Sequence, residues 1–275
     1  MNSPRQSSAA LPRENLHLSA LPPHVEPEHA RRIAGAFDRV RDRIATAAAR
    51  SGRPAQCVTL LAVTKAFGPE TIAAAVAAGQ RCFGENYVQE ATAKMAVLAQ
   101  PGRIDPAAAK DIVWHFIGPI QSNKTRAIAA QFAWVQSIDR ASIAQRLARQ
   151  RDEQIACPAG PLDVLLEVNV SGESTKSGVS PDALRELSEA VCALAPLRLR
   201  GLMAIPQPGL APAAQRAAFA RLRALFDATR AGLLLAHGAV QFDTLSMGMS
   251  DDFEAAILEG STMVRIGSAL FGARK

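Results

Sequence analysis

Long hydrophobic runs are missing from this sequence of 275 residues. No apolar stretch approaches the roughly 18 residues that cross a bilayer, so we expect neither a membrane-spanning helix nor a membrane partner. Residues 1–28 contain several prolines and serines and lack the continuous apolar core of a secretory signal. They predict a flexible leader, followed by one folded domain over residues 29–275 and a cytoplasmic location.

Aromatic residues are also scarce, with one Tyr and two Trp in the whole chain. Basic side chains outnumber acidic ones by 31 to 25, and residues 1–60 hold nine basic and five acidic side chains. Such an excess can attract polyanions. No nucleic-acid-binding motif accompanies it, and a solvated, arginine-rich helix face explains it more simply. We therefore expect no nucleic-acid partner.

Closely spaced cysteines are absent. Cys57, Cys82, Cys157 and Cys192 lie far apart, and none forms the CxxC pair of a zinc or redox site. The spacing does not indicate a disulfide framework, and two of these cysteines lie in apolar stretches where cysteine packs as a small hydrophobe. We expect reduced thiols and no metal site.

What the sequence does contain is a strand–helix unit that recurs eight times. A first helix is expected at residues 28–50, because Ile33, Phe37, Val40 and Ile44 follow helical spacing. The pattern then predicts strands at residues 58–64, 81–84, 112–117, 134–138, 163–170, 199–205, 242–247 and 263–266. It predicts helices at residues 69–78, 87–99, 140–151, 213–230 and 251–258, and helices beginning near residues 122, 181 and 268.

This alternation predicts an α/β protein with a single (β/α)₈ TIM barrel. Eight units in about 220 residues match that fold in number and length. An open, doubly wound sheet shares the alternation, but it is typically marked by a glycine-rich GxGxxG turn after the first strand. The corresponding turn here reads TKAFG at residues 64–68, which favours the barrel.

Polar residues recur at the carboxyl ends of these strands, where barrel enzymes carry their chemistry. They are Lys65, Glu85, Asn86, Asn169, Ser246, Arg265 and Gly267. Lys65 follows an apolar strand, and burial makes a lysine lose its proton more easily. A neutral amine can attack a carbonyl and form a Schiff base. The alternative is a lysine that extends from the strand end into solvent.

Two loops near the carboxyl terminus indicate an anion site. SMGMS at residues 246–250 and RIGS at residues 265–268 each join a strand to a helix. Glycine lets backbone N–H groups approach a ligand closely, and phosphate sites in these barrels are frequently built from the loops after strands 7 and 8. A simpler role is also open for Ser250, as the cap of the following helix with Asp251 and Asp252 in its first turn. Opposite a strand-end lysine, the two loops suggest a phosphorylated carbonyl ligand.

Seven segments resemble the pyridoxal-phosphate homeostasis protein family, formerly labelled proline synthetase co-transcribed proteins. In chain order they are LLAVTK (60–65), CFGENYVQE (82–90), WHFIGPIQSNKTR (114–126), VNVSGESTKSGV (168–179), RGLMAIP (200–206), LSMGMSDDFEAAI (245–257) and STMVRIGSALFG (261–272). The resemblance runs from residue 60 to the carboxyl terminus and leaves the leader outside.

The resemblance implies a barrel like the N-terminal domain of alanine racemase that holds pyridoxal 5′-phosphate as a Schiff base on Lys65. Arg265 occupies the position that faces the pyridine nitrogen. The remaining cofactor-binding positions are Asn86 and Met203 beside the ring, and Ser246, Gly248, Gly267 and Ser268 around the phosphate. Thr64 and Ser268 differ from the commonest family residues but keep a hydroxyl. Ala66 stands where the family commonly has Thr, which removes one.

The partner of the ring nitrogen decides between an enzyme and a holder of the cofactor. Arginine stays protonated at ordinary pH, so Arg265 leaves that nitrogen unprotonated and the ring a weak electron sink. A racemase of the same fold also needs a second acid/base group, and the only tyrosine, Tyr87, is more simply an aromatic at a helix start. A cofactor-free Schiff-base aldolase would leave Arg265 unexplained.

We therefore expect a non-catalytic monomer that keeps free pyridoxal phosphate low and delivers it to apo-enzymes, as the family resemblance implies. The alternative is a small amino-acid racemase.

Two further residues keep open roles. His115 is either a proton carrier near the ring or a hydrogen-bonded core histidine, and Lys176 is either a phosphate contact or a solvated loop residue.

Overall fold

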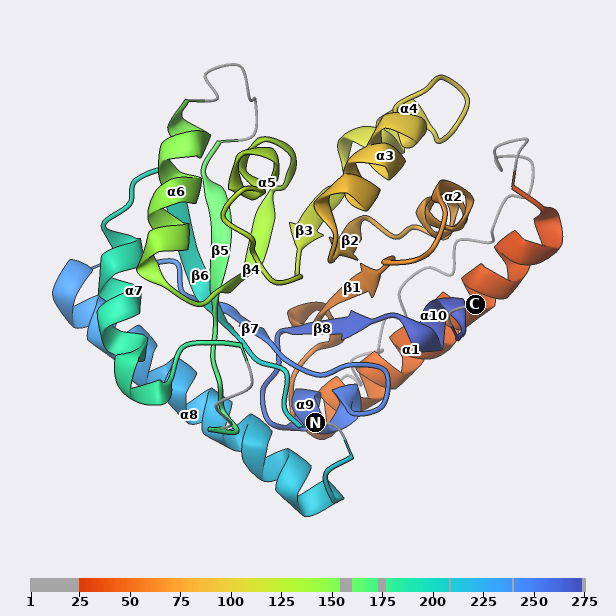
Figure 1. Ribbon diagram of the computed structural model, residues 1–275. Helices are drawn as coiled ribbons and strands as arrows, with labels where there is room; N and C mark the ends of the chain where they lie inside the picture. The colour runs from red at the N-terminus through yellow and green to blue at the C-terminus, as the bar shows by residue number, and fades with distance from the viewer. Residues whose placement is uncertain (1–24, 154–159, 173–176, 208, 239, 274–275) are drawn as a thin grey trace, which may run out of the picture.

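Eight parallel strands close into a barrel in the computed structural model of the chain (Figure 1). The structure describes residues 25–153, 160–172, 177–207, 209–238 and 240–273. Each strand pairs with its neighbours in chain order, and the last strand pairs with the first. The predicted (β/α)₈ barrel is therefore confirmed.

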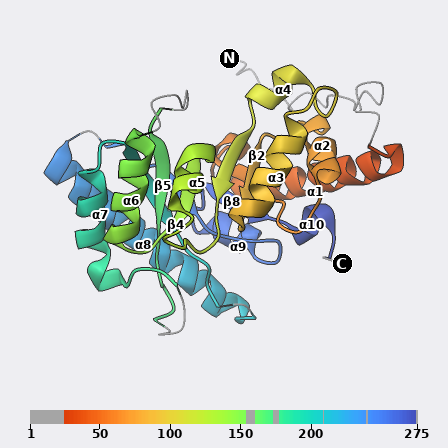
Figure 2. The same cartoon turned by 45° about the horizontal axis from the view of Figure 1, so that its top comes forward.

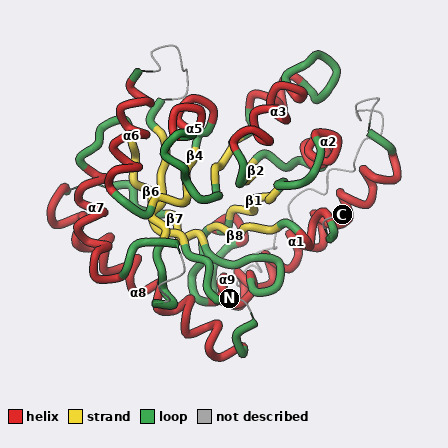
Figure 3. Tube along the Cα trace, in the orientation of Figure 1, coloured by secondary structure: helices red, strands yellow, loops and turns green. Residues whose placement is uncertain are grey.

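The strands are short and lie mostly buried at the centre of the molecule. They are β1 (Thr59–Val63), β2 (Cys82–Glu85), β3 (Val113–Phe116), β4 (Trp134–Ile138), β5 (Leu162–Glu167), β6 (Leu197–Met203), β7 (Thr244–Ser246) and β8 (Met263–Ile266). Figure 3 shows these strands enclosed by the helices. This placement explains why strands such as β1 appear in the sequence as short apolar runs.

The helices form the outer layer, as the turned view of Figure 2 also shows. They are α1 (Pro27–Arg50), α2 (Pro69–Ala77), α3 (Val88–Leu98), α4 (Pro106–Lys110), α5 (Thr125–Gln131), α6 (Ala141–Asp152), α7 (Leu184–Cys192), α8 (Pro212–His237), α9 (Phe253–Leu258) and α10 (Ser268–Phe271). Within the described ranges, none of them combines the length and the apolar character needed to cross a membrane.

Helix α1 completes the outer layer between the helices of the first and last strand–helix units. Ile33, Phe37, Val40 and Ile44 are each at most 4% exposed, so the apolar stripe seen in the sequence faces the protein. Helix α1 contacts α2, α9 and α10, and the Phe37 and Phe271 rings lie 6.0 Å apart. Val25 is buried as well. Residues 1–24 lie outside the described residues, so the boundary at residue 28 stays a prediction.

Two elements differ from the prediction, and the first of them lies at the functional end of the barrel. The strand expected at residues 163–170 ends at Glu167, because the Asn169 N–H donates to the Val179 carbonyl at 3.0 Å instead of continuing the ladder. Helix α4 was not predicted; it begins at a proline, and the Asp105 side chain accepts from the Ala107 N–H at 3.1 Å.

Candidate functional site

Lys65 lies in a tight turn directly after β1, at the end of the barrel where the strands terminate in their carboxyl ends. We call this end the mouth. The Phe67 N–H donates to the Thr64 carbonyl at 3.0 Å and closes the turn. Ala66 has a φ of 66° and is the only non-glycine residue with positive φ in the described part of the chain. Lys65 itself is half-buried.

Arg265 lies on the neighbouring strand β8 and is buried, with 4% exposure. Its Nη1 donates to the Ser246 carbonyl at 2.9 Å, and its Nη2 donates to the Ala204 carbonyl at 2.9 Å. Burial lowers the pKa of Arg265 to about 10, and nearby Glu167 and Asp252 oppose that shift. The guanidinium therefore remains a fixed cation at neutral pH.

Ser246 is fully buried, and its hydroxyl belongs to a hydrogen-bond network inside the barrel. It donates to Gln136 Oε1 at 2.7 Å and accepts from Arg265 Nη1 at 2.7 Å. The Gln136 amide in turn lies 3.1 Å from His115 Nδ1. Because the hydroxyl hydrogen is engaged with Gln136, Ser246 supports Arg265 in this arrangement, and its predicted contact to a phosphate stays a prediction.

His115 lies in the core, which is the simpler of its two predicted roles. It is 1% exposed, and its ring stacks on Trp134 with centroids 5.1 Å apart. Burial lowers the pKa of His115 to about 3, so the imidazole is neutral at physiological pH. Its Nε2 is buried without a partner in the described structure. Lys176, the other residue with an open role, lies outside the described residues.

The two predicted anion-binding loops are adjacent. The Arg265 N–H donates to the Gly248 carbonyl at 3.0 Å, and the Ala269 N–H donates to Ser250 Oγ at 3.2 Å. Ser250 therefore joins the loops, and its expected role as the cap of the next helix is wrong, because α9 begins only at Phe253 with Asp252 at the N-cap position.

Glycine is required at position 248, where φ is +95° and a Cβ would lie 2.6 Å from the Cβ of Ala256. The loop after β7 therefore sits directly on α9. Gly267 and Ser268 follow β8, and Ser268 is exposed, so its hydroxyl is accessible to a ligand.

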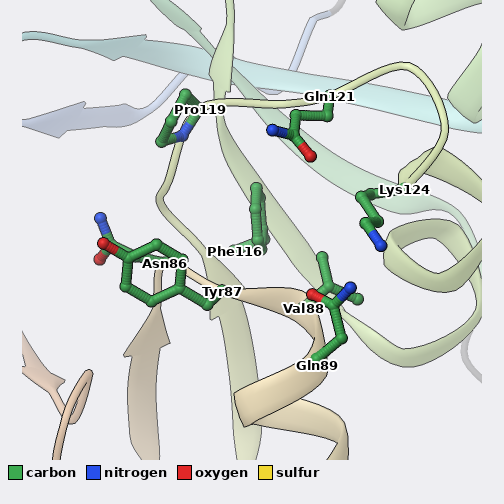
Figure 4. Close-up of a pocket in the computed structure, with 8 residues that line it drawn as sticks. All are labelled: Asn86, Tyr87, Val88, Gln89, Phe116, Pro119, Gln121 and Lys124. Carbon is green, nitrogen blue, oxygen red and sulfur yellow. The ribbon is translucent and has the colours of Figure 1, made fainter.

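Asn86 and Met203 complete the predicted set. Met203 is the buried last residue of β6, with Glu167 and Ser246 as its register partners on the flanking strands. Asn86 lines a pocket between the loops that follow β2 and β3, and its Oδ1 is buried without a partner in the described structure. Figure 4 shows the lining residues of this pocket: Asn86, Tyr87, Val88, Gln89, Phe116, Pro119, Gln121 and Lys124.

Glu167, which the sequence did not single out, ends β5 at the mouth. Burial raises its pKa to about 7; Asp139 adds to the shift and Arg265 opposes it. The signal available in the sequence was a carboxylate near the end of an apolar strand. Asn169, which was expected at this strand end, lies two residues beyond it, and its side chain accepts from the Gly172 N–H at 3.0 Å.

Comparison with known proteins decides the family. Residues 36–275 match the family model of the alanine racemase N-terminal domain. The pyridoxal phosphate homeostasis protein of Pseudomonas aeruginosa is 55% identical over 244 residues, which cover 88% of this chain and 96% of the relative. The chain belongs to the pyridoxal phosphate homeostasis protein family. The family member of Escherichia coli K12 is 48% identical over 88% of this chain and 97% of its own length.

Solved structures agree with this family assignment. PipY of Synechococcus elongatus, whose structure was determined with PLP bound, is similar with a TM-score of 0.68 and 35% identity, covering 85% of this chain and all of PipY. Alanine racemase of Corynebacterium glutamicum aligns with a TM-score of 0.61 at 17% identity over 89% of this chain and 62% of that enzyme. That second likeness concerns the fold alone.

The closed barrel brings the two ends of the predicted site together. Leu61 on β1 pairs with Arg265 on β8, and Ala62 pairs with Ile266. The turn at Lys65 therefore lies beside Gly267 and Ser268, about 200 residues away in sequence. Ser246 and Met203 are register partners on β7 and β6. Asn86 follows β2, the other neighbour of β1.

Proposed function

We propose that this member of the pyridoxal phosphate homeostasis family binds pyridoxal 5′-phosphate at the mouth, with Lys65 as its covalent attachment point. The observation that carries the proposal is the pairing of β1 with β8, which sets the turn of the half-buried Lys65 beside the loop at Gly267 and Ser268, with the buried cation Arg265 preceding that loop on β8. The cofactor bound to PipY supports the same ligand here.

The residues at the mouth suit the groups of this cofactor. Pyridoxal phosphate supplies an aldehyde that bonds to an amine, a ring nitrogen that accepts a hydrogen bond, and a phosphate. Lys65 offers the amine and Arg265 offers N–H donors only, which leaves a ring nitrogen without a proton. Gly248, Gly267 and Ser268 would hold the phosphate, Ser246 would hold Arg265 in place, and Asn86 and Met203 would flank the ring. The Asn86 Oδ1 is buried without a partner in the described structure, so the Asn86 amide is not committed to another side chain there.

The proposed role is to hold and release the cofactor without catalysis. Racemisation needs acid/base groups on both faces of the substrate carbon. Tyr87 is 61% exposed, which suits a surface aromatic better than a positioned base. The names of the relatives agree with a holding role.

Exchange of the α-proton of amino acids in deuterated water tests the absence of racemase activity, with free pyridoxal phosphate as the reference. We expect exchange near that of the free cofactor. Exchange well above it that disappears in Tyr87→Phe or in Glu167→Gln would show an enzyme and name its second acid/base group.

The wider proposal is a cytoplasmic monomer that passes the cofactor to apo-enzymes. The three cysteines in the described part of the chain are free thiols, as a reducing compartment permits. Light scattering measures the mass of the particle, and recovery of activity by an added apo-enzyme measures transfer. A stable dimer, or recovery no faster than with an equal amount of free cofactor, would contradict this proposal.

An absorbance titration tests binding itself. The wild-type protein should develop a visible absorption band with pyridoxal phosphate and bind pyridoxal far more weakly, because hydrogen bonds to a charged phosphate are about twice as strong as neutral ones. Lys65→Ala should lose the band. Equal affinity for pyridoxal and its phosphate would place the anion site elsewhere.

A further inference from the structure

A second lysine lies buried directly beneath the turn that carries Lys65. Lys94 is on α3 and only 5% exposed. Its ammonium donates to three oxygens: the Thr64 carbonyl at 2.7 Å, Glu85 Oε1 at 2.8 Å and Glu90 Oε1 at 2.5 Å. A buried ammonium is stable only when it is paired and hydrogen-bonded, and all three donors of Lys94 have partners.

Each carboxylate held by Lys94 also binds a residue next to Lys65. The Thr64 hydroxyl donates to Glu85 Oε1 at 2.6 Å, and the Ala66 N–H donates to Glu90 Oε1 at 2.6 Å. The residues on both sides of Lys65 are thus connected to one ammonium. We call Thr64, Glu85, Glu90 and Lys94 the clamp.

The conformation of the turn needs such support. Ala66 has a φ of 66°, in the left-handed region where a side chain with a Cβ is disfavoured. A conformation of this kind persists only when its surroundings hold it. The Glu90 carboxylate accepts from the Ala66 N–H, so losing it would let the residue after Lys65 relax.

We propose that Glu90 and Lys94 are positioning residues that hold the Lys65 turn in the form that receives the cofactor, an inference that rests on the proposed function. The clamp also separates the roles of two lysines that lie close together. Lys94 is buried and hydrogen-bonded to two carboxylates and a carbonyl, whereas Lys65 lies on the turn at the mouth.

A matched pair of variants at position 90 tests the proposal, because the Glu90 side chain is 30% exposed and is the least buried side chain of the Lys94 ion pairs. Glu90→Gln removes the charge but keeps an oxygen that accepts from the Ala66 N–H. Glu90→Leu removes charge and acceptor together. Hydrogen exchange of the Ala66 amide, measured by NMR on protein without cofactor, reports the turn, and a titration with pyridoxal phosphate reports binding.

We expect Glu90→Leu to speed exchange at Ala66 and to weaken pyridoxal phosphate binding, each about tenfold, as for the loss of one hydrogen bond to a charged group. Glu90→Gln should stay within about threefold of the wild type in both measurements. Equal behaviour of the Gln and Leu variants, or a loss of affinity in Glu90→Leu with unchanged exchange at Ala66, would overturn the positioning role.

A control variant tests whether the effect is specific to Glu90, and the wild-type titration separates this inference from the function on which it rests. Glu189→Leu removes the glutamate of another helical ion pair with i,i+4 spacing, Arg185–Glu189, which lies on α7; it should leave exchange at Ala66 and cofactor affinity unchanged. Should the wild-type protein fail to bind pyridoxal phosphate, the proposed function falls. The exchange at Ala66 in the Glu90 variants still decides whether the clamp holds the turn.

Discussion

Replacing Ser246 by alanine should destabilise the protein even in the absence of any ligand. The Ser246 hydroxyl is fully buried, donates to Gln136 Oε1 and accepts from Arg265, both at 2.7 Å. In Ser246→Ala the buried Gln136 oxygen loses this donor, which costs about 1–3 kcal/mol. Arg265 keeps the Ser246 main-chain carbonyl and the Ala204 carbonyl, so we expect about 2 kcal/mol in total.

Urea unfolding of the cofactor-free protein measures this loss. The midpoint should fall while the slope with denaturant stays unchanged, which identifies a change in stability alone. Ser268→Ala is the matched control, because Ser268 is exposed and its loss should change the free energy of unfolding by less than about 0.5 kcal/mol. If Ser246→Ala were as stable as the wild type, its hydroxyl would not belong to the interior network.

Two further predictions concern stability. Glu167→Gln should raise the free energy of unfolding by about 2–3 kcal/mol at pH 8 and change it little at pH 4. The reason is that the pKa of Glu167 is about 7 in the folded protein against 4.5 when unfolded, so ionisation of Glu167 disfavours the fold as pH rises. The same gain at both pH values would contradict the shift. Gly248→Ala should lower Tm by several degrees, since the new Cβ would lie 2.6 Å from that of Ala256 at a φ of +95°. Gly267→Ala is its control, because a Cβ there lies 3.4 Å or more from its neighbours; equal Tm values for the two variants would contradict the close approach.

The barrel could be predicted because its strands are short and buried. Residues 134–138 and 263–266 were predicted as strands with the bounds that the structure shows for β4 and β8. Both strands begin and end with apolar residues, and Asp139 and Gly267 follow them as turn signals. The strand predicted at residues 163–170 was too long, because its apolar residues continue past the last ladder bond into a segment that pairs with Val179.

The residues near the carboxyl ends of β7 and β8 could also be predicted, but not the direction of their side chains. Ser246 was expected to reach a phosphate because it precedes a glycine-containing loop. In the structure its hydroxyl faces Gln136 across the barrel, a contact between residues 110 positions apart. Nothing in the local sequence of a three-residue strand indicates which neighbour its last side chain meets.

The clamp under Lys65 was not predicted either, because it also depends on contacts between distant segments that the local sequence does not indicate. Lys94 has the sequence setting of an ordinary polar residue on a helix, yet it is buried. Its burial follows from Glu85 on β2 and the Thr64 carbonyl after β1, which the barrel brings beneath α3. Sequence reasoning therefore found the residue at the mouth, Lys65, and missed the group that supports it.

Reduction with borohydride after addition of pyridoxal phosphate tests the central claim most directly, because it makes the bond between cofactor and lysine permanent. Peptide mapping of the reduced wild-type protein then identifies the labelled residue. The account predicts one label, on Lys65, with Lys94 unmodified although it lies beneath the same turn. A label on Lys94, on Lys124 in the neighbouring pocket, or on no residue at all would contradict it.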